Sequence, residues 1–130
     1  MKRITEAFGQ RLQGSGITRI QWIALYYMKT HQSISQRELS NLMAISDSSA
    51  GRLIDRLQRD GLVNRIPSQI DRRVTMIQLT EEGEQLITNL LHVGVEFNED
   101  LMAGVSNEEK IVFQRVLSKM TDNITGRDAK

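Results

Sequence analysis

The stretch Ile45–Gly61 reads ISDSSAGRLIDRLQRDG and predicts one amphipathic helix between two turns. Ser46 can cap its N-terminus, because a serine oxygen accepts hydrogen bonds from backbone amides two or three residues further along the chain. Gly61 stands where a left-handed residue would end the helix. Between these ends the apolar side chains fall on one face and predict a buried stripe. This stripe consists of Leu53, Ile54 and Leu57.

Basic and small polar side chains mark a different face of the same helix. Arg52, Arg56 and Arg59 recur at spacings of four and three residues. Small residues in the first turns let a backbone approach closely, and hydroxyl groups can bond to phosphates or base edges. These small residues are Asp47, Ser48, Ser49 and Gly51. The pattern favours a helix that enters the major groove of DNA, and an ordinary amphipathic surface helix is the alternative.

A second, shorter helix is predicted just before this one. Ser35–Glu38 matches a capping box, and Leu39 and Leu42 follow as its apolar positions. A tight turn at residues 44–46 joins it to the helix that Ser46 caps. Two short helices connected by a turn of three or four residues are typical of the helix-turn-helix, although many other proteins join helices in this way.

The residues after Gly61 change from a helical period to the alternation of strands. Residues 62–66 predict a strand that ends at Pro67, and residues 74–79 predict a second strand. A β-hairpin directly after a helix-turn-helix makes a winged helix. Its tip carries Asp71-Arg72-Arg73, which suits insertion into the electronegative minor groove, with Asp71 holding one guanidinium in a bidentate pair. A solvated turn is the alternative.

Helices are also predicted on both sides of the winged helix. Residues 1–13 have an apolar side chain at every fourth position, and a capping box at Thr18–Gln21 opens an apolar helix that runs to about His31. Thr80 can cap a long helix, and Ser106–Glu109 is a further capping box before the last helix. The apolar stripes of the outer helices predict a dimer interface, and packing onto the same chain is the alternative. The interface residues are Ile4, Phe8, Leu101, Phe113, Val116, Leu117 and Met120.

Composition excludes several classes of protein. The 130 residues suffice for one domain with a core, and the absence of cysteine rules out disulfides, thiolate metal sites and cysteine redox sensors. The longest apolar run, Trp22–Met28, is far too short to span a bilayer. The N-terminus lacks the apolar segment of a signal peptide. We therefore expect a cytoplasmic protein with no membrane contact.

Charge is distributed unevenly although the net charge is +1. Residues 1–79 carry twelve basic and six acidic side chains, whereas residues 80–130 carry five and ten. A basic first part suits contact with a polyanion, and a chance division of solvated surfaces is the alternative.

No pattern typical of an enzyme or a cofactor site is visible. His31 and His92 are the only imidazole ligands, and no His, Asp and Glu cluster has metal-like spacing. No Ser/His/Asp set and no pair of acids in a catalytic arrangement is visible in the sequence. Gly14-Ser15-Gly16 is too short to be a phosphate-binding loop. We expect no enzymatic activity, no metal and no cofactor.

The sequence resembles the MarR family of bacterial transcription regulators, closely over residues 16–90 and in element order over the whole chain. The run at the wing carries the resemblance most specifically. The matching segments are Gly16-Ile17-Thr18 with Gln21-Trp22, Glu38-Leu39, Arg52-Leu53-Ile54-Asp55-Arg56-Leu57, Asp60-Gly61-Leu62-Val63, and Asp71-Arg72-Arg73 through Leu79-Thr80-Glu81-Glu82-Gly83. Asp47 and Gly51 depart from the family pattern, and the N-terminal helix is shorter than is typical.

The resemblance implies a mainly α fold with a small β-hairpin wing, in a single MarR-type domain over residues 1–130. A winged helix-turn-helix lobe would span residues 18–83, and residues 1–17 and 84–130 would form the dimerisation helices. It implies that each recognition helix enters a major groove while each wing tip reaches an adjacent minor groove. The implied DNA contacts are Gln36, Arg37, Ser46, Ser48, Ser49, Arg52, Arg56, Asp71, Arg72 and Arg73.

The predicted function is that of a homodimeric regulator, a repressor, which binds an inverted repeat in double-stranded DNA. The resemblance also implies release by a small aromatic or carboxylate effector, with Trp22 and Tyr26 as candidate lining residues. A simple core position for these two aromatic residues is the favoured alternative. A winged-helix adaptor that binds proteins instead of DNA is the alternative function.

Overall fold

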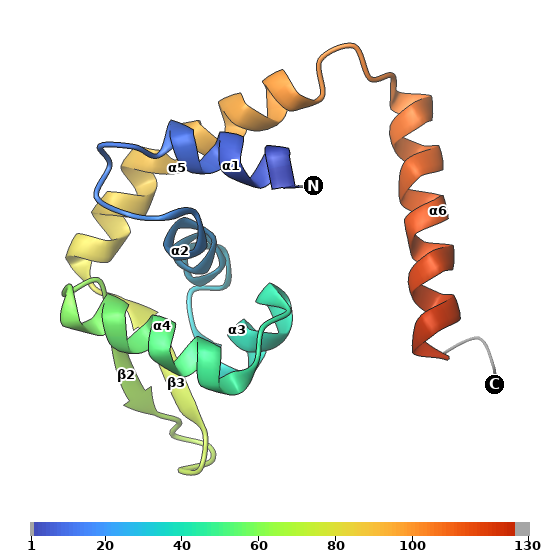
Figure 1. Ribbon diagram of the computed structural model, residues 1–130. Helices are drawn as coiled ribbons and strands as arrows, with labels where there is room; N and C mark the ends of the chain where they lie inside the picture. The colour runs from blue at the N-terminus through green and yellow to red at the C-terminus, as the bar shows by residue number, and fades with distance from the viewer. Residues whose placement is uncertain (1, 127–130) are drawn as a thin grey trace. The chain divides into compact units, whose positions relative to one another are not determined.

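The helices and strands follow the expected order, with one additional short strand. The computed structural model describes residues 2–126, and a first compact unit ends at Phe97 while a second begins at Asn98. The fold is mainly α with a small antiparallel sheet, as the sequence predicts (Figure 1). The elements are α1 (Lys2–Arg11), α2 (Arg19–His31), β1 (Ile34–Ser35), α3 (Gln36–Met43), α4 (Asp47–Arg59), β2 (Val63–Pro67), β3 (Thr75–Leu79), α5 (Glu81–Leu101) and α6 (Asn107–Thr125).

Local capping signals set the beginnings of four helices. The predicted capping boxes at Thr18, Ser35 and Ser106 are all formed, each with reciprocal side-chain and backbone hydrogen bonds. In the second box the Ser35 amide donates to Glu38 Oε1 at 2.9 Å and the Glu38 amide donates to Ser35 Oγ at 3.0 Å. Hydrogen bonding with Ser35, through its backbone first and then its side chain, holds the pKa of the Glu38 carboxyl below the usual value. Thr80 caps α5, since its Oγ1 accepts a hydrogen bond from the Gly83 amide at 3.0 Å.

The turn between α3 and α4 is tight and ordered. Ala44 adopts the left-handed conformation with φ 55°, and Ser46 Oγ then accepts from the Ser49 amide at 3.1 Å to start α4. Gly61, with φ +79°, follows the C-cap of α4 as predicted. The recognition helix of the helix-turn-helix therefore begins and ends where its sequence signals stand.

The sheet contains the predicted hairpin and one strand that the sequence did not predict. β2 pairs with β3 from Val63↔Leu79 to Pro67↔Thr75, which gives the wing. The two-residue β1 pairs with the other edge of β3, with Ile34 opposite Ile77. Two residues are too few to show an alternating period, and Ser35 also serves as the cap of α3. β1 anchors the wing to the start of the helix-turn-helix.

Two glycines of α5 allow close packing against other elements of the first unit. A Cβ on Gly83 would collide with the Leu62 carbonyl oxygen, which also accepts a hydrogen bond from the Thr80 amide. A Cβ on Gly94 would lie 2.5 Å from the Cη2 atom of Trp22. These contacts hold α5 against the end of α4 and against α2.

The core of the first unit includes the stripe predicted on α4. Ile54 and Leu57 are fully buried, whereas Leu53 is partly buried. Phe8, which the sequence predicts at a dimer interface, packs edge-on against Trp22 at 5.1 Å and beside Phe97, so it belongs to the core of its own unit.

The second unit contains α6, whose apolar side chains remain uncovered. No residue of α6 is buried, although the helix is closed by its capping box and by Gly126 in the left-handed conformation. The exposed large apolar residues of this helix are Ile111, Val112, Phe113, Val116, Leu117, Met120 and Ile124. Within residues 2–126 no helix is long and apolar enough to cross a membrane.

Candidate nucleic-acid interface

The N-terminus of α4 presents a connected group of hydroxyls. Ser46 Oγ lies 3.2 Å from Ser48 Oγ and donates to Ser49 Oγ at 3.0 Å. Arg52 Nη2 donates to the same Ser49 Oγ at 3.3 Å. These four residues share the exposed first turns of the helix, where hydroxyl donors and a guanidinium can reach phosphates or base edges. The structure therefore gathers four of the five predicted contacts on the α4 segment into one surface.

Asp47 and Arg37 form the polar connection between α3 and α4. Ser40, which is buried, donates to Asp47 Oδ1 at 2.8 Å, and Arg37 Nη2 lies 3.3 Å from Asp47 Oδ2. In the sequence, Asp47 stands out only as a departure from the family pattern. The structure shows that its charge is paired with Arg37 and that it ties the two helices together.

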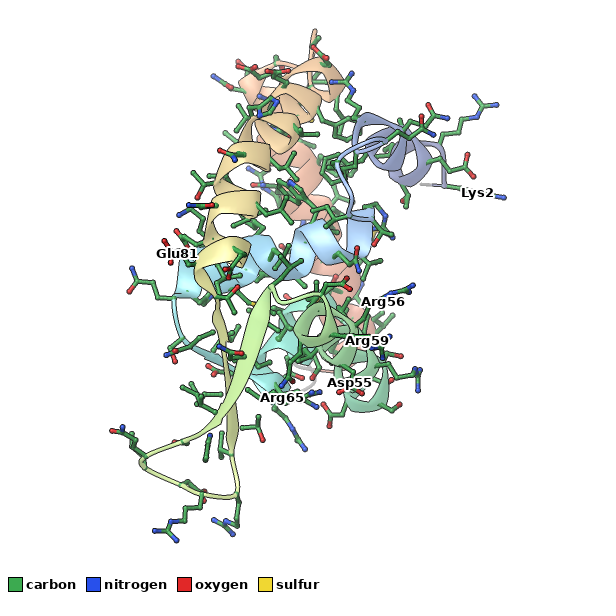
Figure 2. All side chains as sticks on the ribbon, turned by 90° about the vertical axis from the view of Figure 1, so that its left-hand side faces the viewer. Lys2, Asp55, Arg56, Arg59, Arg65 and Glu81 are labelled. Atoms are coloured by element: carbon green, nitrogen blue, oxygen red, sulfur yellow. The ribbon has the colours of Figure 1, made fainter. Side chains whose placement is uncertain are left out.

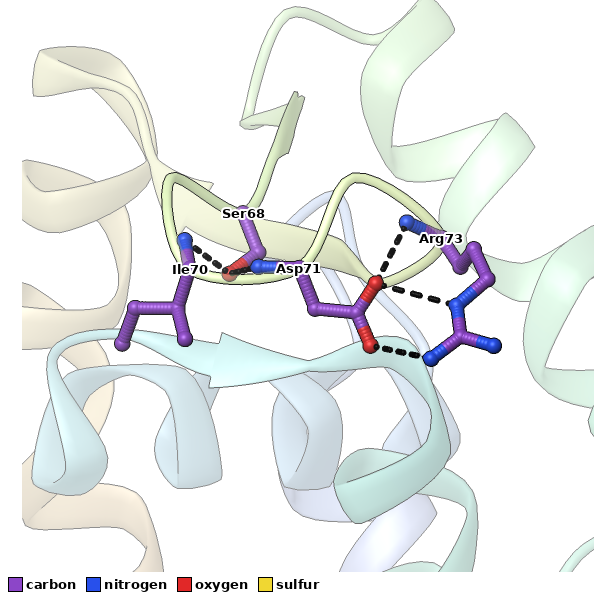
Figure 3. A network of polar contacts seen from close by, with 4 residues as sticks. All are labelled: Ser68, Ile70, Asp71 and Arg73. Carbon is purple, nitrogen blue, oxygen red and sulfur yellow. Dashed lines mark hydrogen bonds and ion pairs between the residues drawn. The ribbon is translucent and has the colours of Figure 1, made fainter.

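The wing tip holds Arg73 in a defined orientation (Figure 3). Ser68 Oγ accepts hydrogen bonds from the amides of Ile70 and Asp71 at 3.1 and 3.3 Å, which shapes the turn. Arg73 donates from Nε and Nη2 to the two oxygens of Asp71, both at 3.1 Å. This confirms the predicted bidentate pair. The hydrogen bonds from Arg73 hold the pKa of the Asp71 carboxyl below its usual value.

A groove of about 630 Å³ separates the wing from the start of α3. Arg37 lines it together with Asp47 on one side, and Arg73 lines it together with Asp71 on the other. Ser35, Gln36, Val74 and Thr75 complete the lining. A guanidinium has five N–H donors, and the pairing of each arginine with its carboxylate uses at most two of them, so the remaining donors can bind phosphate oxygens.

The remaining predicted contacts lie in different settings. Arg56 on α4 (Figure 2) and Arg72 at the wing tip are exposed. Gln36 is partly buried, and its Oε1 accepts a hydrogen bond from Arg65 Nε at 3.4 Å. Gln36 thus faces the junction between α3, α4 and β2.

Arg65 is a residue of this surface that the sequence did not reveal. It projects from β2 onto α4, where its guanidinium contacts Asp55 at 2.6 Å, Gln58 at 3.0 Å and the Gly51 carbonyl at 3.0 Å (Figure 2). A lone arginine in a strand gives no signal of this kind. Its partners at residues 51, 55 and 58 share one helical face, but nothing in the sequence pairs that face with β2.

The aromatic residues predicted to line an effector site form a stack. Trp22 and Tyr26 lie with ring centroids 5.3 Å apart and an interplanar angle of 6°. Trp22 is buried and donates from Nε1 to the Leu90 carbonyl at 3.0 Å, whereas Tyr26 is 38% exposed. One ring therefore belongs to the core and the other reaches the surface. No group of three His, Asp or Glu side chains capable of holding a metal occurs in the described part of the chain.

Comparison with known proteins identifies the family. A model of the MarR family matches residues 15–74, which include the helix-turn-helix and the wing tip. The uncharacterized HTH-type transcriptional regulator YsmB of Bacillus subtilis (strain 168) is 33% identical over 104 residues, covering 80% of this chain and 71% of the relative. The chain belongs to the MarR family. It is therefore a DNA-binding transcriptional regulator with a winged helix, from a family of regulators and not of enzymes.

Further relatives share the sequence or the fold. The HTH-type transcriptional repressor NicR of Pseudomonas putida is 28% identical over 122 residues, covering 94% of this chain and 77% of the relative. A MepR–DNA complex from S. aureus matches with a TM-score of 0.85 at 24% identity, over 94% of this chain and 90% of that chain. A structure of BpsR from Bordetella bronchiseptica, whose DNA binding is regulated by 6-hydroxynicotinic acid, matches with a TM-score of 0.81 at 22% identity, over 93% of this chain and 86% of that chain. At these identities the two structures show a shared fold.

Proposed function

We propose that this MarR-family protein acts as a homodimeric repressor that binds an inverted repeat in double-stranded DNA. One observation carries the proposal. The hydroxyl-rich start of α4 and the Asp71-braced Arg73 stand in one compact unit, on either side of the groove that Arg37 lines. α4 would enter a major groove, the wing tip would reach the adjacent minor groove, and the groove between them would receive the intervening backbone.

A homodimer follows from the uncovered face of α6. Phe113 is 64% exposed, and the apolar side chains that follow it at helical spacing are exposed as well. A helix with an apolar stripe normally buries that stripe against a partner. A second copy of the same stripe provides this cover with two-fold symmetry, and an inverted repeat has the same symmetry. Half-sites should then lie roughly 10 base pairs apart, centre to centre.

Selection from a random duplex pool tests this function directly. The purified full chain is incubated with the pool at about physiological salt, and the retained duplexes are sequenced. We expect enrichment of an inverted repeat, with affinity that falls steeply as salt rises. Weak, salt-sensitive retention without enrichment would contradict specific binding and would favour the adaptor function.

Repression is proposed because the relative NicR is described as a transcriptional repressor. The selected repeat is placed beside a promoter, and transcription is measured in vitro with and without the protein. We expect the transcript to decrease as the repeat is occupied. An increase would identify an activator instead, without affecting the proposal of operator binding.

Release by a small aromatic or carboxylate effector is also proposed, with Tyr26 and Trp22 beside the ligand. The support is the half-exposed aromatic stack, together with the regulation of the structurally similar BpsR by 6-hydroxynicotinic acid. An effector must bind the free and DNA-bound states with different affinities to shift the equilibrium.

Trp22 is the only tryptophan in the chain, so its fluorescence reports directly on this stack. Titration with 6-hydroxynicotinic acid, and with salicylate as a second aromatic acid, should change the emission and lower operator affinity in parallel. The Tyr26→Ala variant should weaken both responses. Loss of operator binding without any change in emission would place the effector site elsewhere, and no response at millimolar concentrations would count against this class of effector.

A further inference from the structure

We propose that Arg65 is a positioning residue that fixes the wing relative to the recognition helix, so that both can read one operator half-site. The inference rests on the proposed function and deepens it. Arg65 itself makes no contact with DNA in this proposal. Arg65 fixes the position of the wing relative to α4. It therefore affects how well the protein distinguishes its operator from other sequences, and not its general affinity for DNA.

The contacts of Arg65 join three elements at one point. From β2 it reaches the side chains of Asp55 and Gln58 and the carbonyl of Gly51, all on the face of α4 that turns toward the strand. Its Nε also donates to Gln36 at the beginning of α3. Arg65 therefore connects both helices of the helix-turn-helix to the wing.

These contacts engage most of the hydrogen-bonding capacity of the side chain. A guanidinium has five N–H donors in a fixed fork. The hydrogen bonds to Gln36, Gln58 and Gly51 use one donor each on Nε, Nη1 and Nη2. Nη1 also forms an ion pair with Asp55 Oδ1 at 2.6 Å. The side chain is about one quarter exposed, in contrast to the outward Arg73 of the wing tip. A phosphate would have to displace protein acceptors to bind it.

The backbone that carries Arg65 is itself well fixed. Arg65 lies in the middle of β2, opposite Ile77 of β3, and Ile77 in turn stands opposite Ile34 of β1. Ile77 and Ile34 are both buried. The guanidinium thus extends from a rigid strand and fixes α4 at three positions spaced over about two turns, which opposes both sliding and rotation of the helix against the wing.

The first test replaces Arg65→Met and measures binding by fluorescence anisotropy over a salt series. Two duplexes of equal length are compared, the selected operator and an unrelated sequence. Without correct positioning, the operator-to-unrelated affinity ratio should fall by about tenfold, the cost of roughly one mismatched base pair. The slope of affinity against salt should stay unchanged, because Arg65 does not touch phosphate in this proposal. Arg3→Met, which removes the same charge from an exposed position of α1, is the control and should leave the ratio unchanged.

Asp55→Asn keeps the proposal falsifiable if Arg65→Met fails to fold by circular dichroism. Removing an acidic charge near a polyanion should by itself raise affinity for both duplexes. Asp60→Asn, at the C-cap of α4, makes the same charge change away from Arg65 and should show this general rise alone. Asp55→Asn should in addition lower the affinity ratio, because it replaces the ion pair between Asp55 and Arg65 by a weaker contact with a neutral amide.

The outcomes separate this inference from the proposed function. If the unaltered chain shows no preference for any duplex, the proposed function fails. If it shows a preference and Asp55→Asn and folded Arg65→Met leave the ratio unchanged, the positioning role is overturned. An equal decrease on both duplexes in Arg65→Met, with the salt slope reduced by about one, would identify Arg65 as a phosphate-binding residue and would also overturn it.

Discussion

The recognition helix α4 and the terminal helix α6 have similar apolar patterns in the sequence but opposite burial in the structure. On α4, Ile54 and Leu57 are fully buried. On α6, Phe113 and Val116 stand at the same spacing of three residues and remain exposed. Both helices begin with a serine cap. The comparison shows that helical period identifies the apolar face of an element, whereas it carries no information about which molecule covers that face.

The first unit is self-contained in its polar groups as well. Within residues 2–126, no buried side-chain nitrogen or oxygen lacks a hydrogen-bond partner. Asp47 binds the buried Ser40, and Trp22 binds the Leu90 carbonyl. α6 in contrast buries none of its residues, although most helical stability in proteins comes from the packing of an apolar face. The difference supports the proposal that a second copy of the chain covers the apolar face of α6.

The largest expected effect comes from placing a charge on the apolar face of α6. Phe113→Asp should convert the proposed dimer to a monomer, because a carboxylate cannot be buried without a partner. A monomer can engage only one half-site at a time, so operator affinity should fall by about 10²–10⁴-fold. Sedimentation velocity and anisotropy measure the two effects. Asn123→Asp, which adds the same charge at an exposed polar position of α6, should leave both unchanged. A Phe113→Asp chain that still sediments as a dimer would contradict the assignment of the interface.

The next largest effect compares two glycines that differ only in their surroundings. Gly83→Ala should lower the free energy of unfolding by about 3 kcal/mol, since the new Cβ meets the Leu62 carbonyl and must shift backbone. Gly9→Ala, within α1 and with open space around its Cβ, should instead raise it by about 0.5–1 kcal/mol. Urea unfolding followed by circular dichroism measures both. Equal effects would contradict the packing of α5 onto the end of α4.

Short-range signals allowed most of the fold to be predicted from the sequence. A capping box depends on four consecutive residues, and the boxes at Thr18, Ser35 and Ser106 all form. The hairpin and the pairing of Asp71 with Arg73 likewise involve neighbours in the chain. The physics that decides these features is contained within a few residues, so the sequence displays it.

Features that depend on distant partners could not be predicted in the same way. β1 is defined by pairing with a strand forty residues later, as Ile34↔Ile77. Asp47 resembles an unfavourable charge until Ser40 and Arg37 are placed around it. Arg65 gains its role from acceptors on α3 and α4 that the sequence does not bring together. Each case requires knowledge of which elements meet, and a single sequence does not provide that.

The wing tip belongs to the first unit, as α4 does, but its side chains are exposed, as those of α6 are. Arg73 is 89% exposed and is oriented in advance by Asp71. Arg73→Ala should therefore weaken operator binding by about 1–3 kcal/mol and leave the unfolding free energy within about 0.5 kcal/mol. Anisotropy and urea unfolding give the two values. An unchanged binding curve would contradict the wing assignment, and a large loss of stability would contradict the exposed position.

The smallest expected effect concerns pH and tests whether this orientation exists in solution. The pKa of Asp71 is lowered by hydrogen bonds from Arg73, so Asp71 remains charged and the pair intact at every pH above the usual aspartate value of 3.8. The contribution of the Asp71–Arg73 pair to operator affinity disappears only as pH falls through the lowered pKa of Asp71. The affinity difference between the unaltered chain and Asp71→Asn should thus stay constant from pH 8 to pH 5, measured by anisotropy at fixed salt. A difference that shrinks between pH 6 and pH 5 would mean that Asp71 takes up a proton there. The wing tip would then lack a fixed orientation of Arg73 in solution.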